Sequence, residues 1–162
     1  ASSSGIEIVN DGYRRTPDGL VFAPFQQSQI DLLIPLLKDI AKRHGVTPDR
    51  ILGHSDIAPL RKEDPGPQFP WKQLADAGLV QWPSETVVAR VLPQFQASLP
   101  NAAWFQKKLA AHGFAVAQSG EMDAPTRRVL SVFQMKYRPA NFDGVPDAPT
   151  AAILAALTGG TD

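Results

Sequence analysis

Apolar positions form a short run and then a longer helical pattern in the first third of the chain. The β-branched run Ile6–Val9 stops at an Asn-Asp-Gly turn signal and predicts a short strand. Glycine and proline recur through residues 12–24, which predicts a loop. Apolar residues return at helical spacing from Ser28 to His44, and Gly45 is expected to end this helix. Pro35 lies inside it and is expected to kink the helix or shorten its first turns.

A second strand and helix are expected to follow this pair. Thr47-Pro48-Asp49 is typical of a turn or a helix start, and Ile51-Leu52 predicts a short buried strand that leads into His54. A proline-rich loop covers residues 57–70, and a short helix is predicted from Trp71 to Ala77. The order strand, helix, strand, helix predicts an α/β unit.

The last third of the chain contains a repeat with an offset of 24 residues. Ser119–Leu130 aligns with Asp143–Leu154, and the two segments share Gly, Asp, Ala, Pro, Thr and Leu at equivalent positions. Glycine suits a turn, aspartate caps a helix, and proline is tolerated in the first helical turn. Helices are therefore predicted near Pro125–Lys136 and Pro149–Leu157, and a third near Ala102–His112, which together predict a small three-helix bundle.

The pattern divides the chain into three parts. Residues 1–83 form the first domain, residues 84–99 a linker, and residues 100–160 the helical domain. The linker is bounded by Pro83 and Pro100 and carries an apolar patch, so it is expected to pack against one of the two domains.

Composition narrows the class of protein. The 162 residues suffice for one ordinary domain or two small ones, and 43% hydrophobic with 20% charged residues is typical of globular proteins. Equal numbers of basic and acidic residues, 16 of each, argue against nucleic acid as the main partner. No apolar run is long enough for a transmembrane segment. The absence of cysteine excludes a disulfide framework and a thiolate metal site.

The densest group of reactive side chains lies between residues 53 and 67. His54 and Asp64 are ten positions apart, and the Pro-Gly-Pro turn after Asp64 could return its carboxylate towards the histidine. Imidazole and carboxylate are both zinc ligands, but a catalytic zinc needs three protein ligands and only two are found. The alternative is structural, with a packed histidine and a turn aspartate.

Two further charged residues are candidates for chemistry. Lys62 lies two positions before Asp64, where an ammonium could stabilise a developing oxyanion. Glu7 lies between Ile6 and Ile8 in the predicted strand, so its carboxylate faces away from the core and could act as a general base. The alternatives are a solvated surface lysine and an exposed strand glutamate.

These residues carry a resemblance to a known family. The run His-Ser-Asp-Ile-Ala-Pro-Leu-Arg-Lys-Glu-Asp-Pro-Gly-Pro from His54, preceded by Gly-Ile-Glu-Ile from Gly5, resembles the AmpD/AmiD-type zinc N-acetylmuramoyl-L-alanine amidases. The repeat-bearing tail is similar to the type 1 peptidoglycan-binding domain. The resemblance implies an α/β mixed-sheet zinc amidase domain, truncated at its N-terminus, followed by a small three-helix bundle.

The resemblance also implies a role for each candidate residue. His54 and Asp64 correspond to zinc ligands, Glu7 to the catalytic glutamate and Lys62 to the residue that stabilises the transition state. The family's remaining zinc ligand is a histidine on a strand upstream of the glutamate, and no histidine of this chain matches it. The third ligand is therefore expected upstream of Ala1, either in the same polypeptide or in a separate N-terminal fragment; no substrate-binding residue is assigned.

The resemblance implies a hydrolase of the bacterial cell wall. The expected reaction is zinc-dependent hydrolysis of the amide bond between N-acetylmuramic acid and L-alanine in peptidoglycan or its fragments. The expected location is the periplasm or cell envelope of a Gram-negative bacterium, and the expected partner is peptidoglycan. The alternative is a non-catalytic peptidoglycan-binding or recognition protein, for which Glu7 and Lys62 would have no use.

Overall fold

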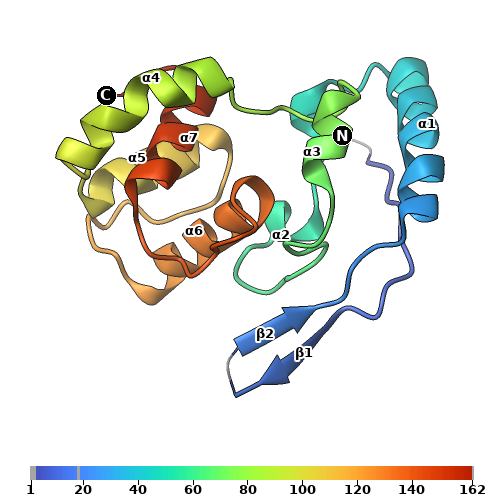
Figure 1. The fold of residues 1–162 in the computed structure, drawn as a ribbon, viewed down its shortest axis with the longest axis horizontal. Helices are drawn as coiled ribbons and strands as arrows, with labels where there is room; N and C mark the ends of the chain where they lie inside the picture. Colours follow the sequence, from blue (N-terminus) through green and yellow to red (C-terminus); the bar gives the residue numbers. More distant parts are fainter. Residues whose placement is uncertain (1–2, 18, 162) are drawn as a thin grey trace.

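The computed structural model describes residues 3–17 and 19–161, which form a helix-rich fold with one small sheet (Figure 1). Helices α4–α7 lie on one side of the molecule and α1 on the other, with α2 and α3 between them. The elements are β1 (Tyr13–Thr16), β2 (Gly19–Phe22), α1 (Gln27–His44), a 3-10 turn (Pro48–Arg50), α2 (His54–Ile57), α3 (Trp71–Asp76), α4 (Glu85–Ala97), α5 (Ala102–His112), α6 (Ala124–Tyr137) and α7 (Ala148–Thr158).

The sheet lies where the sequence predicts a loop. β1 and β2 pair antiparallel, with Tyr13 opposite Phe22 and Thr16 opposite Gly19. Gly19 has a φ of +119°, a conformation that glycine adopts without strain, and this allows the chain to reverse within a few residues. The prediction for residues 12–24 was therefore wrong, because the turn residues there close a hairpin.

Two predicted strands are absent from the described residues. Ile6–Val9 and Ile51-Leu52 run as irregular backbone, since neither lies beside a strand with which it could form a ladder. The first segment is held by side chains instead: Gln29 Nε2 of α1 donates to the Val9 carbonyl at 2.7 Å. The predicted α/β unit is thus a helix-rich unit whose described sheet has only two strands.

The N-terminal helices form as predicted and share a core. α1 runs through Pro35 without a break, so its first turns are not shortened, and Gly45 ends it with a φ of +65°. The short helix predicted from Trp71 is α3. The core residues of this half come from α1, from α3 and from the segments that flank α3: Ile30, Leu33, Phe69, Trp71, Leu74, Leu79 and Val80.

The three predicted C-terminal helices correspond to α5, α6 and α7. Asp123 and Asp147, at equivalent positions of the repeat, cap α6 and α7 by accepting hydrogen bonds from Thr126 N at 2.8 Å and Thr150 N at 2.9 Å. None of the described helices is long and apolar enough to cross a membrane.

A buried glutamine supports each copy of the repeat. Gln106 accepts a hydrogen bond from Gly120 N at 2.8 Å and donates to Thr126 Oγ1 at 3.0 Å. Gln134 makes the equivalent contacts to Gly144 N at 2.8 Å and Thr150 Oγ1 at 3.2 Å. Both glutamines are fully buried. The repeated Gly and Thr therefore serve packing, because each satisfies the polar groups of a glutamine that has left solvent.

The segment predicted as a linker contains a helix. α4 lies within residues 84–99, and Ser84 caps it by accepting from Val87 N at 3.4 Å. Phe95 is only 3% exposed in the core shared with α5–α7, and Val88 and Leu92 pack against the same core. The segment thus packs on the C-terminal helices and adds a fourth helix to them.

Candidate active site

His54 is the first residue of α2 and lies where the chain leaves an extended segment. The Asp56 carboxylate accepts a hydrogen bond from Gly53 N at 2.9 Å and so orders the start of this short helix. A Cβ atom at Gly53 would come within 2.5 Å of Pro65 Cδ, so only glycine allows the loop to pack this closely beside His54. The sequence predicts that a strand leads into His54. In the structure a helix begins there instead, so His54 still lies at one end of an element.

The structure brings His54 and Asp64 into direct contact. His54 Nδ1 and Asp64 Oδ2 are hydrogen-bonded, and the carbonyl of Asp64 accepts from Ser55 N at 2.9 Å. The side chains of His54 and Asp64 are about half exposed, at 46% and 53%. The ten-residue spacing therefore closes a loop that places an imidazole and a carboxylate together at the surface.

Glu7 lies beside the same pair although it is not in a strand. Its Oε1 atom is 3.9 Å from His54 Nε2, and its side chain is 88% exposed. The segment that carries it is 47 residues earlier in the sequence than His54. A solvent-exposed carboxylate, an imidazole and a second carboxylate thus meet in one place.

Lys62 lies in the turn that connects α2 to Asp64. Its amide donates to the Ala58 carbonyl at 3.0 Å, and its own carbonyl accepts from Arg128 Nη2 at 2.7 Å. Across residues 3–17 and 19–161, the structure gives its ammonium no ion pair or hydrogen bond. The backbone of Lys62 is therefore fixed, while its side chain remains available for other contacts.

The contact between His54 and Asp64 offers part of what a zinc ion requires. The two side chains supply a nitrogen and an oxygen donor, which are both ordinary zinc ligands. Within the part of the chain that the structure describes, no group of three or more His, Cys, Asp or Glu residues could hold a metal ion. The pair fits part of a zinc site and leaves at least one protein ligand to come from elsewhere.

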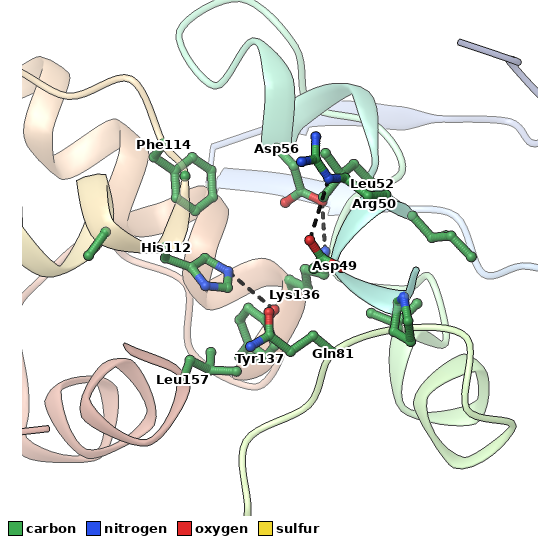
Figure 2. A pocket seen from close by; sticks show the side chains of 15 residues that line it. Asp49, Arg50, Leu52, Asp56, Gln81, His112, Phe114, Lys136, Tyr137 and Leu157 are labelled. Atoms are coloured by element: carbon green, nitrogen blue, oxygen red, sulfur yellow. Dashed lines mark hydrogen bonds and ion pairs between the residues drawn. The ribbon is translucent and has the colours of Figure 1, made fainter. Parts of the chain in front are cut away.

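A second cluster of charged and aromatic residues lies between the two halves and was not predicted. A cavity of about 400 Å³ lies here, and His112, Tyr137, Lys136 and Asp56 are among its lining residues. Figure 2 shows these side chains. His112 Nε2 and Tyr137 Oη are 3.3 Å apart, and Lys136 Nζ is 2.8 Å from Asp56 Oδ2. None of the four predicted site residues lines this cavity.

The environment of this cavity changes the acidity of two side chains. Burial lowers the pKa of His112 to about 4, with a smaller contribution from the nearby Lys136 ammonium and an opposing one from Asp56. Burial also raises the pKa of the Tyr137 phenol well above its usual value. Both groups are therefore neutral near pH 7. No local sequence signal marks this cluster, because Asp56 and Lys136 are 80 residues apart.

Two family patterns match this chain. Residues 1–67 match the N-acetylmuramoyl-L-alanine amidase family, and this part contains Glu7, His54, Lys62 and Asp64. Residues 98–154 match the putative peptidoglycan binding domain family, which includes most of α5–α7. The two matches thus define an amidase-type segment joined to a helical segment of the putative peptidoglycan-binding type.

Named relatives agree with the amidase match. AmiD of Escherichia coli, an N-acetylmuramoyl-L-alanine amidase, is 41% identical over 157 residues, which are 96% of this chain and 56% of that protein. The solved complex of E. coli AmiD with anhydro-N-acetylmuramic acid-L-Ala-D-gamma-Glu-L-Lys has a TM-score of 0.83 at 39% identity, covering 94% of this chain and 60% of that one. AmpDh3 of Pseudomonas aeruginosa has a TM-score of 0.81 at 39% identity, covering 90% and 57%.

The resemblance to AmpD/AmiD-type amidases with an appended peptidoglycan-binding domain is thereby confirmed. The chain spans only a little over half the length of AmiD.

Proposed function

We propose that this chain is part of a zinc-dependent amidase that hydrolyses the bond between N-acetylmuramic acid and L-alanine in peptidoglycan or its fragments. The observation that supports this most directly is the meeting of His54, Asp64 and Glu7 inside the segment that matches the amidase family. The bound molecule named for E. coli AmiD contains this linkage, and the present chain shares 39% identity with that structure.

In this proposal, His54 and Asp64 hold the zinc ion. A third protein ligand comes from sequence upstream of Ala1 or from a separate N-terminal fragment, because Glu7 serves proton transfer in this proposal and no group of three or more His, Cys, Asp or Glu among the described residues could hold a metal ion. When bound, zinc supplies Lewis-acid chemistry at the scissile carbonyl. The exposed position of both side chains leaves the substrate free to reach them.

The side chains of this chain carry out the proton transfers. The Glu7 carboxylate is close to His54 and open to solvent, so it can take a proton from the attacking water. The water oxygen forms a bond to the carbonyl carbon, the C–N bond breaks, and Glu7 returns the proton to the leaving alanine nitrogen. The Lys62 ammonium stabilises the negative charge that develops on the carbonyl oxygen.

The C-terminal helices bind the wall polymer in this proposal. The match of residues 98–154 to a putative peptidoglycan-binding family supports this role. This match and the similarity to AmiD of E. coli together support a location in the periplasm or cell envelope of a Gram-negative bacterium. The binding segment would keep the exposed His54–Asp64 pair near its substrate and raise the local concentration of scissile bonds.

The proposal is tested by His54→Ala and Asp64→Asn in the longest form of the protein that its gene encodes. Zinc content and cleavage of a soluble anhydromuramyl peptide are measured on the same samples, with His44→Ala, at the exposed end of α1, as the matched control. Both site variants are expected to lose zinc and activity, and the control to keep both. Wild-type protein that binds wall but neither holds zinc nor cleaves the amide would instead identify a non-catalytic binding protein.

A further inference from the structure

We propose that helix α6 positions the loop that carries Lys62, and that Arg128 is the positioning residue. This inference rests on the proposed function, because it assigns Arg128 an effect on the reaction through Lys62. It also gives the C-terminal helices a second role besides wall binding, since they complete the shape of the amidase loop at residues 58–64. Arg128 does not itself contact substrate in this proposal.

Arg128 contacts three groups of the loop at once. Its Nε atom donates to the Pro59 carbonyl at 2.9 Å, and its Nη2 atom donates to the Lys62 carbonyl at 2.7 Å and to Glu63 Oε2 at 2.8 Å. The Arg128 and Glu63 side chains are 24% and 22% exposed, so solvent competes little for these bonds. Only a guanidinium offers several donors in one rigid plane, and a lysine could not span these acceptors.

A second contact fixes the other end of the same segment. Lys136, further along α6, forms its ion pair with Asp56 of α2, and the same Asp56 oxygen accepts from Gly53 N. The Lys136 ammonium also lies 4.2 Å from the centre of the Trp71 ring. Helix α6 therefore holds the chain two residues after His54, through Asp56, and again at Lys62, two residues before Asp64.

The position of the Lys62 ammonium depends on these backbone contacts. Its amide is bonded to Ala58 and its carbonyl to Arg128, whereas no hydrogen bond or ion pair from the described residues orients its side chain. The loop backbone thus sets the direction in which Lys62 leaves the chain. A displacement of about 1 Å in a group that supports the transition state costs on the order of 10²-fold in rate.

The experiment compares Arg128→Ala, Lys62→Ala and their double variant in the longest form of the protein. Arg127→Ala is the matched control, because Arg127 is the neighbouring arginine on α6 and is exposed. Arg128→Ala is expected to lower kcat on a soluble anhydromuramyl peptide by about 10²-fold with little change in KM. Lys62→Ala is also expected to lower kcat, and the double variant to match Lys62→Ala alone, since Arg128 acts through Lys62.

Hydrogen exchange supplies a readout that does not depend on activity. The amides of Ala58 and of residues 60–63 are expected to exchange about tenfold faster in Arg128→Ala than in wild type or Arg127→Ala. If Arg128→Ala does not fold, Arg128→Lys takes its place, because it keeps the charge and loses the planar set of donors.

The outcomes separate this inference from the proposed function. Full activity in Lys62→Ala refutes the proposed role of Lys62 and, with it, this inference. A loss in Lys62→Ala with normal kcat in the Arg128 variant refutes only the positioning role. Independent losses that multiply in the double variant, or unchanged exchange at Ala58 and residues 60–63, also refute it, because Arg128 would then act elsewhere or not hold the loop.

Discussion

Lys136 Nζ lies 2.8 Å from Asp56 Oδ2 in a salt bridge whose side chains are only 5% and 9% exposed. The pair joins α6 of the C-terminal helices to α2, the helix that begins with His54. A buried pair of this kind is strongly destabilised when one partner is removed, because the other charge remains in a low-dielectric environment. In the intact chain, removal of either partner is therefore expected to destabilise the contact between the two halves.

Lys136→Met is expected to lower the free energy of unfolding by about 3–5 kcal/mol, because it leaves the Asp56 carboxylate buried without a cation. Urea unfolding followed by tryptophan fluorescence measures this change. Lys107→Met, on the exposed face of α5, is the matched control and is expected to change stability by less than about 0.5 kcal/mol. Equal stability of the two variants would show that the buried pair contributes little.

The lowered pKa of His112 predicts that the free energy of unfolding depends on pH. Its pKa is about 4 in the folded protein, whereas the pKa of a histidine in an unfolded chain is about 6.5, so between these values the unfolded state binds the extra proton. The contribution of neutral His112 to the free energy of unfolding is fully present above a pH of about 6.5 and is lost as the pH falls towards about 4. The loss is on the order of 3 kcal/mol.

Unfolding curves of wild type and His112→Gln at several pH values between about 4 and 7 test this point. The variant is expected to be less stable at neutral pH, because it disturbs the packing beside Tyr137 and Phe133, but to lose less stability on acidification. His44→Gln, at the exposed end of α1, is expected to follow the wild-type curve. Parallel curves for wild type and His112→Gln would contradict a buried neutral histidine.

Helix positions could be predicted from the sequence where caps and periodicity agree. Asp123 and Asp147 mark the starts of α6 and α7, and Gly45 marks the end of α1, because these residues satisfy backbone groups locally. Strands were predicted poorly, since Ile6–Val9 has β propensity but lies beside no partner strand in the described residues. α4 was missed because Pro93 disfavours a helix locally, while burial of its apolar face favours one.

In the candidate site, too, a contact between residues close in the sequence could be predicted, whereas contacts between distant residues could not. His54 and Asp64 are ten residues apart, and the intervening proline-rich loop makes their contact predictable. Arg128 and Lys136 could not be linked to this loop, because more than 60 residues separate each from its partners and no motif marks either one. Such contacts are set by how two packed units meet, which local pattern does not encode.

The C-terminal helices are expected to fold alone only when α4 is included. Phe95 of α4 is 3% exposed in the shared core, and loss of a buried phenylalanine alone costs about 3–5 kcal/mol. Residues 84–162 are therefore expected to unfold cooperatively and to sediment with insoluble peptidoglycan, whereas residues 98–162 are expected to be less stable by at least this amount. Thermal unfolding and sedimentation of both pieces measure the difference.

Two outcomes would contradict these expectations, one for wall binding and one for the packing of α4. If the folded piece 84–162 stays in the supernatant while the complete protein sediments, binding resides outside these helices. If the piece 98–162 proves as stable as the longer one, the packing of α4 on this core contributes little to its folding.

Glu7→Gln is the most direct test of the chemistry. The Glu7 side chain is 88% exposed, so the substitution is expected to leave the free energy of unfolding within about 0.5 kcal/mol of wild type. As a general base, however, Glu7 accepts the proton of the attacking water, and an amide cannot accept it. Cleavage of a soluble anhydromuramyl peptide is expected to fall by about 10²–10⁴-fold. Glu121→Gln, at another exposed glutamate outside the segment that matches the amidase family, is the matched control and is expected to retain full activity.

Zinc content measured on the same samples distinguishes two roles for Glu7. Glutamine keeps the size of the side chain and leaves the donor atoms of His54 and Asp64 unchanged, so a general base predicts lost activity with zinc retained. Loss of both zinc and activity would make Glu7 a support of the metal site, acting through its 3.9 Å approach to His54 Nε2. Full activity in Glu7→Gln would leave Glu7 a solvated carboxylate beside the site, and the proton acceptor would have to be another group.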